Sequence, residues 1–171
     1  KKIILSMILY PNAKINIGLN ILERRIDNYH NISSVFYPLH DLYDILEIIP
    51  SKNFSFSSSG IKMSTNSNNI CIEAVNLLKS DFNIPNVMIH LHKVIPIGGG
   101  LGGGSSDGSF VLKGINKLFD MGLTNNQLEK YALNLGADCP FFIDNVPKYV
   151  EGVGEKMRDL DLDLSNYRIE I

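Results

Sequence analysis

A dense run of glycines constrains this chain more than any other feature of its sequence. Six of the fourteen glycines fall between Gly98 and Gly104. Glycine loses more backbone entropy on folding than any other residue, so a cluster this dense needs a structural reason. Without Cβ atoms, successive peptide N–H groups can turn inward and surround an anion. The run therefore predicts a loop whose backbone comes close to a bound ligand.

The elements expected on either side of the run indicate what that ligand is. A strand is expected over residues 87–95, and a helix with apolar residues at helical spacing is expected to begin near Ser105. The positive end of a helix favours phosphate, and the hydroxyls of Ser105 and Ser106 can reach phosphate or a bound Mg²⁺. A plain surface loop is the alternative, which the flanking strand and helix disfavour. We interpret Gly98 to Ser106 as a phosphate-binding loop.

Two better-known phosphate motifs fit the run poorly. The chain has no G-x-x-x-x-G-K-[ST] sequence, which excludes a P-loop. Gly98, Gly100 and Gly103 match the spacing of a dinucleotide fingerprint, but that fingerprint follows the first strand of its domain and pairs with an acid ending the second strand. Here the run lies far into the chain, and the acid at about the right distance, Asp120, falls in an expected helix.

Two polar residues far from the run stand out. Residues 13–21 alternate between apolar odd and polar even positions, which predicts a half-buried strand with Lys14 and Asn16 on its polar face. Taken alone, Lys14 is then a solvated surface lysine. Asp138 lies between Gly136 and Pro140, which predicts a constrained turn, and an Asx-turn is its ordinary structural role.

The remaining pattern predicts one α+β domain over residues 1–171. Short strands are expected at 32–38, 43–49 and 54–58, with breaks at Pro38 and Pro50, and a hairpin at 149–157 and a strand start at 167–171 follow. Helices are expected at 70–78, capped by Asn68 or Asn69, and from Thr124, which forms a capping box with Gln127, to Gly136. Phe141 and Phe142 are expected in the core.

Composition excludes several classes of protein. The net charge of −2 over 171 residues offers no electrostatic case for a nucleic acid or an anionic membrane as partner. No apolar run reaches the length of a membrane span. Cys71 and Cys139 are far apart and are expected to be unpaired thiols in a reducing, cytoplasmic setting, with Cys139 packed rather than nucleophilic. His90 and His92 share a strand face but have no third ligand in view, so no metal site is predicted.

Three stretches together resemble a known family. They are Pro11–Asn16 with Tyr29-His30, then Gly100–Asp107, then Gly136–Phe142. In order and spacing they resemble the GHMP kinases, a superfamily named for galactokinase, homoserine kinase, mevalonate kinase and phosphomevalonate kinase. Within it, the longer glycine run and the Tyr-His pair are most similar to the branch that acts on diphosphocytidyl methylerythritol.

The resemblance implies a fold and an activity. The fold is that of the GHMP-kinase N-terminal domain, which is like ribosomal protein S5 domain 2 and has a left-handed β-α-β crossover. The activity is transfer of the ATP γ-phosphate, with Mg²⁺, to the 2-hydroxyl of the methylerythritol moiety in the non-mevalonate isoprenoid pathway. Another GHMP kinase, of the mevalonate pathway or for homoserine, is the nearest alternative. A non-catalytic nucleotide-binding module is an alternative of another class.

The resemblance also implies roles for individual residues. Lys14 and Asp138 are the expected catalytic pair and should converge in space, and Asn16, Tyr29 and His30 are expected to contact the diphosphocytidyl substrate. The residues expected at the nucleotide are Asn69, Lys93, Pro96, Gly98, Gly99, Gly100, Leu101, Gly102, Gly103, Gly104, Ser105, Ser106 and Asp107. A valine at position 103 is expected to weaken ATP binding without unfolding the domain.

The chain departs from the family pattern in three respects. Asp27-Asn28 replaces the usual Asp-Gly, a change that Asn28 tolerates because asparagine accepts left-handed backbone. Gly108 replaces the usual alanine, which is expected to weaken the helix start slightly. Members of the family are longer and have a second domain that holds part of the cytidine pocket. The chain is therefore expected to be the N-terminal ATP-binding domain and to be nearly inactive alone.

Overall fold

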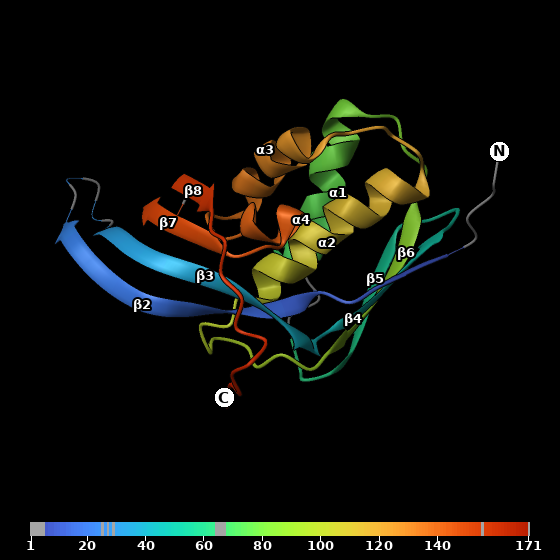
Figure 1. Ribbon diagram of the computed structural model, residues 1–171. Helices are drawn as coiled ribbons and strands as arrows, with labels where there is room; N and C mark the ends of the chain where they lie inside the picture. Colours follow the sequence, from blue (N-terminus) through green and yellow to red (C-terminus); the bar gives the residue numbers. More distant parts are fainter. Residues whose placement is uncertain are drawn as a thin grey trace.

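Two four-stranded sheets and four helices make up the described part of the chain, which in this computed structural model is residues 6–24, 26, 28, 30–63, 68–154 and 156–170 (Figure 1). The strands are β1 Met7–Leu9, β2 Asn12–Arg24, β3 His30–Tyr43, β4 Ile45–Pro50, β5 Ser55–Gly60, β6 Val87–Lys93, β7 Lys148–Gly152 and β8 Lys156–Asp159. The helices are α1 Ile70–Asp81, α2 Gly103–Leu118, α3 Asn125–Leu135 and α4 Phe141–Asp144.

The first sheet contains the parallel crossover that the family resemblance implies. Its strand order is β1-β4-β6-β5, and β5 pairs in parallel with β6 after a connection through α1. β5 lies at the edge of the sheet. The β5-α1-β6 unit is therefore the expected β-α-β crossover, and its left hand stays a prediction.

The second sheet, ordered β2-β3-β7-β8, corrects the expected break at Pro38. Strand β3 continues through Pro38 to Tyr43, with Pro38 opposite Lys14 of β2. On the other side of β3, pairing with β7 ends at Phe36. Proline is tolerated where a strand has no partner for the missing N–H, so the residue need not end β3.

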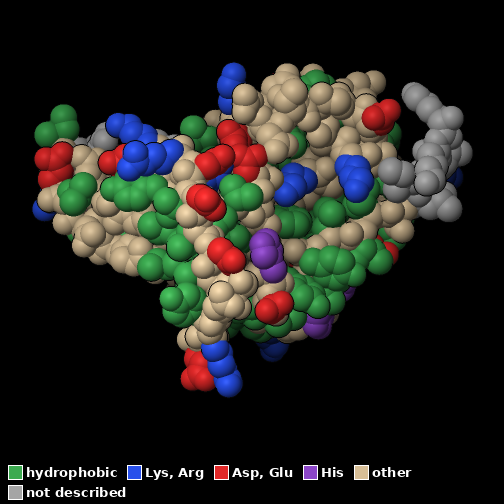
Figure 2. Space-filling model, in the orientation of Figure 1, with side chains coloured by type: hydrophobic (Ala, Val, Ile, Leu, Met, Phe, Trp, Pro, Cys, Tyr) green, Lys and Arg blue, Asp and Glu red, His purple; other side chains and the backbone are tan. Residues whose placement is uncertain are grey.

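The pattern predicted for β2 is wrong in its outer half. Ala13 is fully buried, but Ile17, Leu19 and Ile21 are 38%, 53% and 64% exposed. The pairing of β2 with β3 shifts register between Ile17 and Leu19 and again beyond Ile21, and Gly18 between them has a φ of +66°. Every residue of β2 from Asn16 to Arg24 is exposed, at odd and even positions alike. The outer half of the strand therefore extends beyond the core, and alternation in the sequence gives no buried face there. Figure 2 shows hydrophobic side chains at the surface over this hairpin.

The helix boundaries follow the predicted capping chemistry. Asn69 caps α1, where its side-chain oxygen accepts a hydrogen bond of 2.9 Å from the Cys71 N–H. Thr124 and Gln127 form both halves of the capping box of α3, which ends at Gly136 as predicted. Helix α2 begins at Gly103, two residues before the expected start. Local side-chain chemistry therefore fixed the starts of α1 and α3, as expected of caps.

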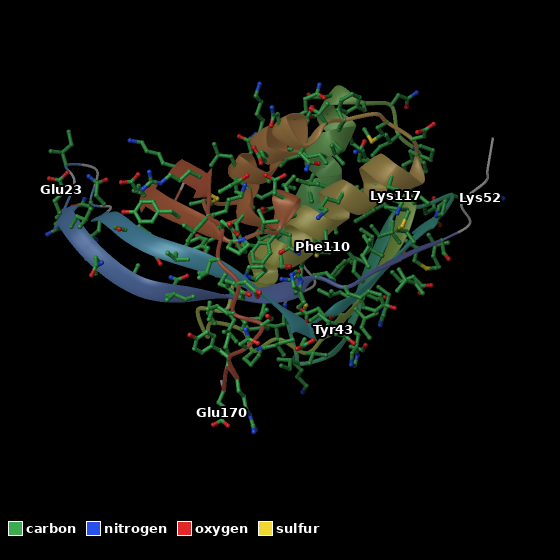
Figure 3. The ribbon with its side chains drawn as sticks, in the orientation of Figure 1. Glu23, Tyr43, Lys52, Phe110, Lys117 and Glu170 are labelled. Carbon is green, nitrogen blue, oxygen red and sulfur yellow. The ribbon has the colours of Figure 1, made fainter. Side chains whose placement is uncertain are left out.

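Helix α2 lies at the centre of the molecule and packs closely on both neighbouring layers (Figures 1 and 3). A Cβ at Gly114 would lie 2.6 Å from Leu9 Cδ1 and 2.7 Å from Ile48 Cδ1, so a larger residue there would force these side chains of the first sheet to shift. A Cβ at Gly108 would lie 2.8 Å from Ile70 Cγ1 of α1. Gly108 is therefore more than a weak helix former, because it allows α1 and α2 to approach each other.

The aromatic pair before β7 is part of the core, as predicted. Phe141 and Phe142 are both fully buried, with ring centroids 5.0 Å apart, and Phe141 also packs edge-on against Phe36 of β3. The strand start expected at 167–171 is absent from Tyr167 to Glu170, and Ile171 lies outside the described residues. None of the helices among the described residues is long and apolar enough to cross a membrane.

Candidate functional site

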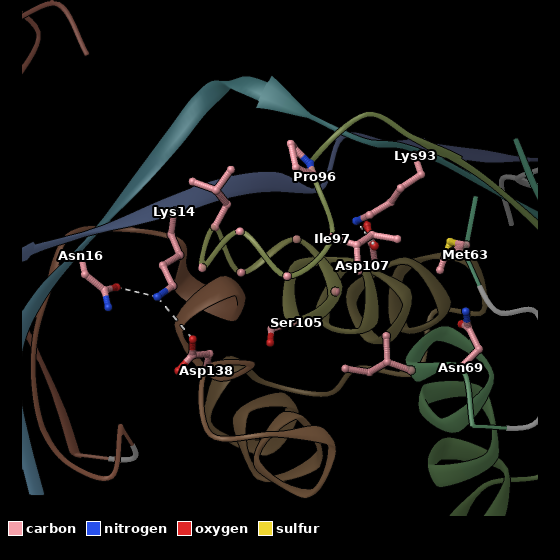
Figure 4. Close-up of a pocket in the computed structure, with 18 of the residues that line it drawn as sticks. Lys14, Asn16, Met63, Asn69, Lys93, Pro96, Ile97, Ser105, Asp107 and Asp138 are labelled. Atoms are coloured by element: carbon pink, nitrogen blue, oxygen red, sulfur yellow. Dashed lines mark hydrogen bonds and ion pairs between the residues drawn. The ribbon is translucent and has the colours of Figure 1, made fainter. Parts of the chain in front are cut away.

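The glycine run lines a pocket of about 760 Å³ beside the start of α2 (Figure 4). Side chains from β2, β6, α1 and the turn before α4 complete its wall. The lining residues are Lys14, Asn16, Met63, Asn68, Asn69, Ile70, Lys93, Pro96, Ile97, Gly98, Gly99, Gly100, Leu101, Gly102, Gly103, Gly104, Ser105, Asp107 and Asp138. The elements thus bring together segments that are up to 124 positions apart in sequence (138 − 14).

The start of α2 is arranged for an anion. Gly102, the N-cap, has a left-handed backbone with φ +69°, and no described side chain caps the helix. The first turn carries no acidic residue. The first N–H groups of a helix lack partners within it, so they and the helix dipole attract a negative group when no side chain competes. These features favour phosphate at the end of α2 that lines the pocket.

Three consecutive glycines of the loop have different surroundings. A Cβ at Gly102 would lie 2.9 Å from Phe142 Cζ and 3.0 Å from Lys14 Cγ. A Cβ at Gly103 would lie 2.9 Å from both Ile95 Cγ2 and Lys93 Nζ. At Gly104 no described atom would lie within 4 Å. A valine at position 103 would therefore press against Ile95 and Lys93, whereas Gly104 faces open space. The predicted loss of ATP binding on this substitution stays a prediction.

Lys14 and Asp138 converge, as predicted. The Lys14 ammonium nitrogen lies 3.4 Å from Asp138 Oδ2 and donates a hydrogen bond of 2.5 Å to Asn16 Oδ1 (Figure 4). It also lies 4.1 Å above the ring centroid of Phe36. Lys14 is only 3% exposed, so the interpretation of it as a solvated surface lysine is wrong. The Asp138 side chain is 35% exposed and opens onto the pocket.

The position of Lys14 depends on the loop itself. Its peptide N–H donates a hydrogen bond of 2.8 Å to the carbonyl oxygen of Leu101. Leu101, Ile95 and Ala13 form a small buried cluster below this bond. The inner end of β2 is therefore covered by the loop, which explains why a lysine flanked by alternating residues is buried here.

On the other side of the pocket, a second set of charged residues, centred on Lys93, forms the floor. The ammonium of Lys93 lies 2.6 Å from Oδ2 of Asp107 and 2.6 Å from Oδ2 of Asp44. Burial lowers the pKa of Lys93, but the attraction of Asp107 and Asp44 outweighs it and raises the pKa overall. Burial raises the pKa of Asp107 well above its usual range, although Lys93 opposes this. The second oxygen of Asp107 has no hydrogen-bond partner within the described part of the chain.

Most of the residues expected at the nucleotide line this one pocket, and Ser106 is the exception. Ser106 is fully buried, and its hydroxyl has no partner among the described residues. Of the residues expected at the substrate, Asn16 lines the pocket, whereas His30 begins β3 opposite Arg24 and does not. Tyr29 lies outside the described residues. The roles of all these residues stay predictions.

The sequence did not point to several residues of the site. Met63, Asn68, Ile70 and Ile97 line the pocket. Ile70 and Asn68 adjoin the predicted cap at Asn69, which was a usable signal, whereas Met63 follows a Ser-rich segment with no pattern. Asp44 is buried between β3 and β4 and reaches Lys93 only through the tertiary fold.

The structure also bears on the metal and cysteine expectations. The described residues contain no group of three or more His, Cys, Asp and Glu side chains arranged to hold a metal. Ser57 and Ser59 of β5 lie 2.9 Å from ring nitrogens of His90, and Ser59 lies 2.9 Å from His92 Nδ1, so the histidines join a hydrogen-bonded row across the sheet. Both cysteines are free and buried, and burial raises the pKa of Cys139 to about 11, which fits packing rather than nucleophilic attack.

Comparison with known proteins identifies the domain. Residues 69–145, which include the glycine loop and Asp138, match the GHMP kinases N terminal domain. The chain contains a GHMP kinase N-terminal domain. The match agrees with the predicted family, and the two sheets and four helices described above show the predicted α+β fold.

Relatives of this GHMP kinase domain agree in name. The chain is 48% identical over 166 residues to the 4-diphosphocytidyl-2-C-methyl-D-erythritol kinase of Azobacteroides pseudotrichonymphae, and 49% identical over 170 residues to that of Bacteroides thetaiotaomicron. Each match covers 96% of this chain and 62% of the relative. The chain therefore spans less than two thirds of the length of these curated relatives.

Solved structures show the same fold. A crystal structure of 4-(cytidine 5'-diphospho)-2C-methyl-D-erythritol kinase matches with a TM-score of 0.78 and 34% identity, covering 92% of this chain and 56% of that one. The homoserine kinase of Cytophaga hutchinsonii matches with a TM-score of 0.60 at 15% identity, over 94% of this chain and 53% of that one. At 15% identity the second match shows a common fold alone.

Proposed function

We propose that this GHMP kinase domain binds ATP and that the full-length protein phosphorylates the 2-hydroxyl of 4-diphosphocytidyl-2-C-methyl-D-erythritol. The observation that carries this proposal is the ion pair of Lys14 and Asp138 in the same pocket as the uncapped start of α2. The names of relatives at 48–49% identity support the choice of substrate. We propose further that residues 1–171 correspond to the N-terminal domain of that kinase and that it works in the cytoplasm.

The chain's own groups can perform such a transfer. The glycine loop and the first N–H groups of α2 would hold the phosphates, which fixes the donor in place. Asp138 would accept the proton that the attacking hydroxyl loses, and Lys14 would orient that hydroxyl and offset negative charge. Transfer of a phosphoryl group depends mostly on positioning and charge stabilisation, so these groups would supply the chemistry once the full-length protein holds both substrates.

The site also fits Mg²⁺ that arrives with the nucleotide. Mg²⁺ in kinases keeps several waters and binds through one or two carboxylates together with the substrate phosphates. The half-exposed carboxylate of Asp138 and the hydroxyl of Ser105 both line the pocket and are oxygen donors of the kind Mg²⁺ prefers. When bound, the ion would neutralise charge on the phosphates.

A coupled assay of ADP release tests the proposal. The full-length protein is mixed with ATP, Mg²⁺ and the diphosphocytidyl substrate, and mevalonate and homoserine are tested in parallel. We expect ADP release with the diphosphocytidyl substrate and none with mevalonate or homoserine. Turnover with mevalonate or homoserine instead would assign another GHMP activity, and ATP binding without turnover on any of the three would favour a non-catalytic module.

A further inference from the structure

A buried charged cluster lies directly beneath the glycine loop. It consists of Asp44, Lys93 and Asp107, which are 0%, 3% and 0% exposed. The three residues come from the β3–β4 junction, the end of β6 and the first turns of α2. Burying a charge costs free energy unless the charge is paired. Moving one of the three elements would break a buried pair, so the cluster holds the elements at fixed separations.

Asp44 makes more contacts than the ion pair with Lys93 requires. Its second oxygen, Oδ1, accepts hydrogen bonds of 2.6 Å from the Val94 N–H and 2.9 Å from the Ile95 N–H. Its own peptide N–H donates a bond of 2.8 Å to the carbonyl oxygen of Pro11, just before β2. One carboxylate therefore fixes the backbone of the two residues that lead from β6 into the loop.

The same cluster fixes the far end of the loop. Lys93 joins Asp44 to Asp107, and Asp107 lies four residues after the start of α2. Between these ends, Ile95 lies under Gly103 so closely that a Cβ there would come within 2.9 Å of Ile95 Cγ2. The segments before and after the glycine run are thus fastened to one another through Asp44 and Lys93 (Figure 4 shows Lys93 and Asp107).

The cluster has two carboxylates, those of Asp44 and Asp107, for the one ammonium of Lys93. Burial is the main cause that raises the pKa of Asp107, and the negative charge of Asp44 adds to it. Asp107 lines the pocket, whereas Asp44 is not among the described residues that do. Asp44 can therefore act on the pocket only through the loop backbone, Lys93 and Asp107.

We propose that Asp44 is a positioning residue for nucleotide binding, which holds the two ends of the glycine loop in the spacing that a triphosphate requires. This inference rests on the proposed function, because it takes the ligand of the loop to be a nucleoside triphosphate. Displacement of a positioned group by about 1 Å can cost roughly a hundredfold in rate. For binding, each lost hydrogen bond to a charged phosphate costs about ten- to a hundredfold in affinity.

The test compares Asp44→Ala and Asp44→Asn with the wild type, all as full-length protein. Calorimetric titration with a non-hydrolysable ATP analogue measures binding without any need for the second substrate. Asp44→Ala removes every side-chain bond and is expected to weaken binding by about 10- to 100-fold, the cost of a lost hydrogen bond from the loop to a charged phosphate. Asp44→Asn keeps an oxygen for Val94 and Ile95 and is expected to retain more affinity. In turnover assays the KM for ATP should rise, while the KM for the second substrate should change by less than about twofold.

A control separates positioning from general loss of stability. Val75 in α1 is 1% exposed and belongs to the main core, so Val75→Ala lowers stability away from the cluster. Its affinity for the analogue should equal that of the wild type. If Asp44→Ala binds the analogue as tightly as wild type, or no more weakly than Val75→Ala, the positioning role is refuted.

Amide hydrogen exchange gives a readout that survives even if Asp44→Ala fails to fold. In the wild type the N–H groups of Val94 and Ile95 should exchange as slowly as core strands, and Asp44→Asn should leave them protected. Exchange of these two amides as fast as that of Gly98–Gly100 would contradict the inference. If the wild-type protein does not bind the analogue, the proposed function is contradicted instead. The exchange rates of the Val94 and Ile95 amides would still test whether Asp44 fixes the backbone that leads into the loop.

Discussion

Asp138 and Lys14 face each other across 3.4 Å, and the two residues differ in their access to solvent. The lysine side chain is 4% exposed and bonded to Asn16, so its position is fixed by the fold. The carboxylate is 35% exposed, so a substrate hydroxyl can reach it from the pocket. This asymmetry suits a fixed cation beside an accessible proton acceptor.

Asp138→Asn tests the proton acceptor. The substitution keeps size and hydrogen bonding but removes the charge, and it is expected to lower kcat by about 10²- to 10⁴-fold if base catalysis matters. ATP affinity measured without Mg²⁺ should change little, because Asp138 is not part of the glycine loop. Asp120→Asn is the matched control, since Asp120 is exposed beyond the far end of α2. Steady-state kinetics of the full-length protein measure both, and equal rates in the two variants would remove Asp138 from the mechanism.

Gly104→Ala tests the loop at the glycine that faces open space. The added methyl group should block an N–H contact with phosphate and weaken ATP binding by about 10-fold or more, since a bond to a charged group contributes roughly 1.5–3 kcal/mol. Alanine is also a better helix former than glycine, so stability should rise by up to about 1 kcal/mol.

The matched control for this prediction is Gly103→Ala. Its methyl group would meet Ile95 and Lys93 at 2.9 Å, so the expected effect is a loss of stability of about 1–3 kcal/mol from overpacking. Thermal melts and calorimetric titration distinguish the two variants. If Gly104→Ala binds ATP as the wild type does, phosphate does not contact the loop at that position.

The pKa of Cys139 predicts how stability depends on pH. Burial raises it from 9.0 to about 11, so the unfolded thiol ionises at lower pH than the folded one. Stability is therefore retained below about pH 9 and falls as the pH rises toward 11, by up to roughly 3 kcal/mol from this residue. Denaturant melts between pH 8 and 11 measure the fall. Cys139→Ser, which does not titrate in this range, should show a smaller fall, and an identical pH profile would contradict the prediction.

At the scale of elements, the turn between β7 and β8 adjoins the site. Gly154 in this turn has a φ of +114°, and a Cβ there would lie 3.5 Å from Asp138 Oδ1 and 3.6 Å from Ala137 Cβ. The turn therefore forms the wall behind the carboxylate. The hairpin was predicted from its glycines, but its position behind Asp138 follows only from the packing of the second sheet.

Gly154→Ala is expected to lower kcat with little effect on ATP affinity. The substitution strains the left-handed backbone by about 1–3 kcal/mol and places a methyl group against Asp138. Gly122→Ala is the control, because Gly122 also has positive φ, +73°, but no described atom lies within 4 Å of its Cβ position. Both variants should lose stability. If kcat falls equally in both, strain rather than contact with Asp138 is the cause.

Elements defined by local chemistry were predictable from the sequence, and those defined by packing were not. The cap at Asn69 and the capping box at Thr124 depend on side chains within three residues, so the helix starts were predicted. Asn28 adopts the predicted left-handed backbone, with φ +66°. The burial of Lys14 depends on a loop more than eighty residues away, and Asp44 matters only after β4 and β6 pair. Neither could be inferred from spacing.

At the scale of the whole molecule, the chain matches 62% of the length of its curated relatives. We expect residues 1–171 alone to turn over far more slowly than the full-length protein, because transfer needs both substrates held in near-attack geometry. The ADP-release assay on equal molar amounts of both proteins measures this. A rate for residues 1–171 similar to that of the full-length protein would show that this domain holds both substrates by itself.

Lys14 contacts both halves of the site, the glycine loop on one side and Asp138 with Asn16 on the other. Its peptide N–H holds the carbonyl of Leu101 in the glycine loop, and its ammonium contacts Asp138 and Asn16. Under the proposed function, a shift of the loop on nucleotide binding would move Lys14, whose amine is proposed to orient the acceptor hydroxyl. Because linkage between two binding sites is reciprocal, occupancy of either site changes the free energy of filling the other by the same amount. If the proposed function is right, strand β2 therefore links the nucleotide side of the pocket to the acceptor side.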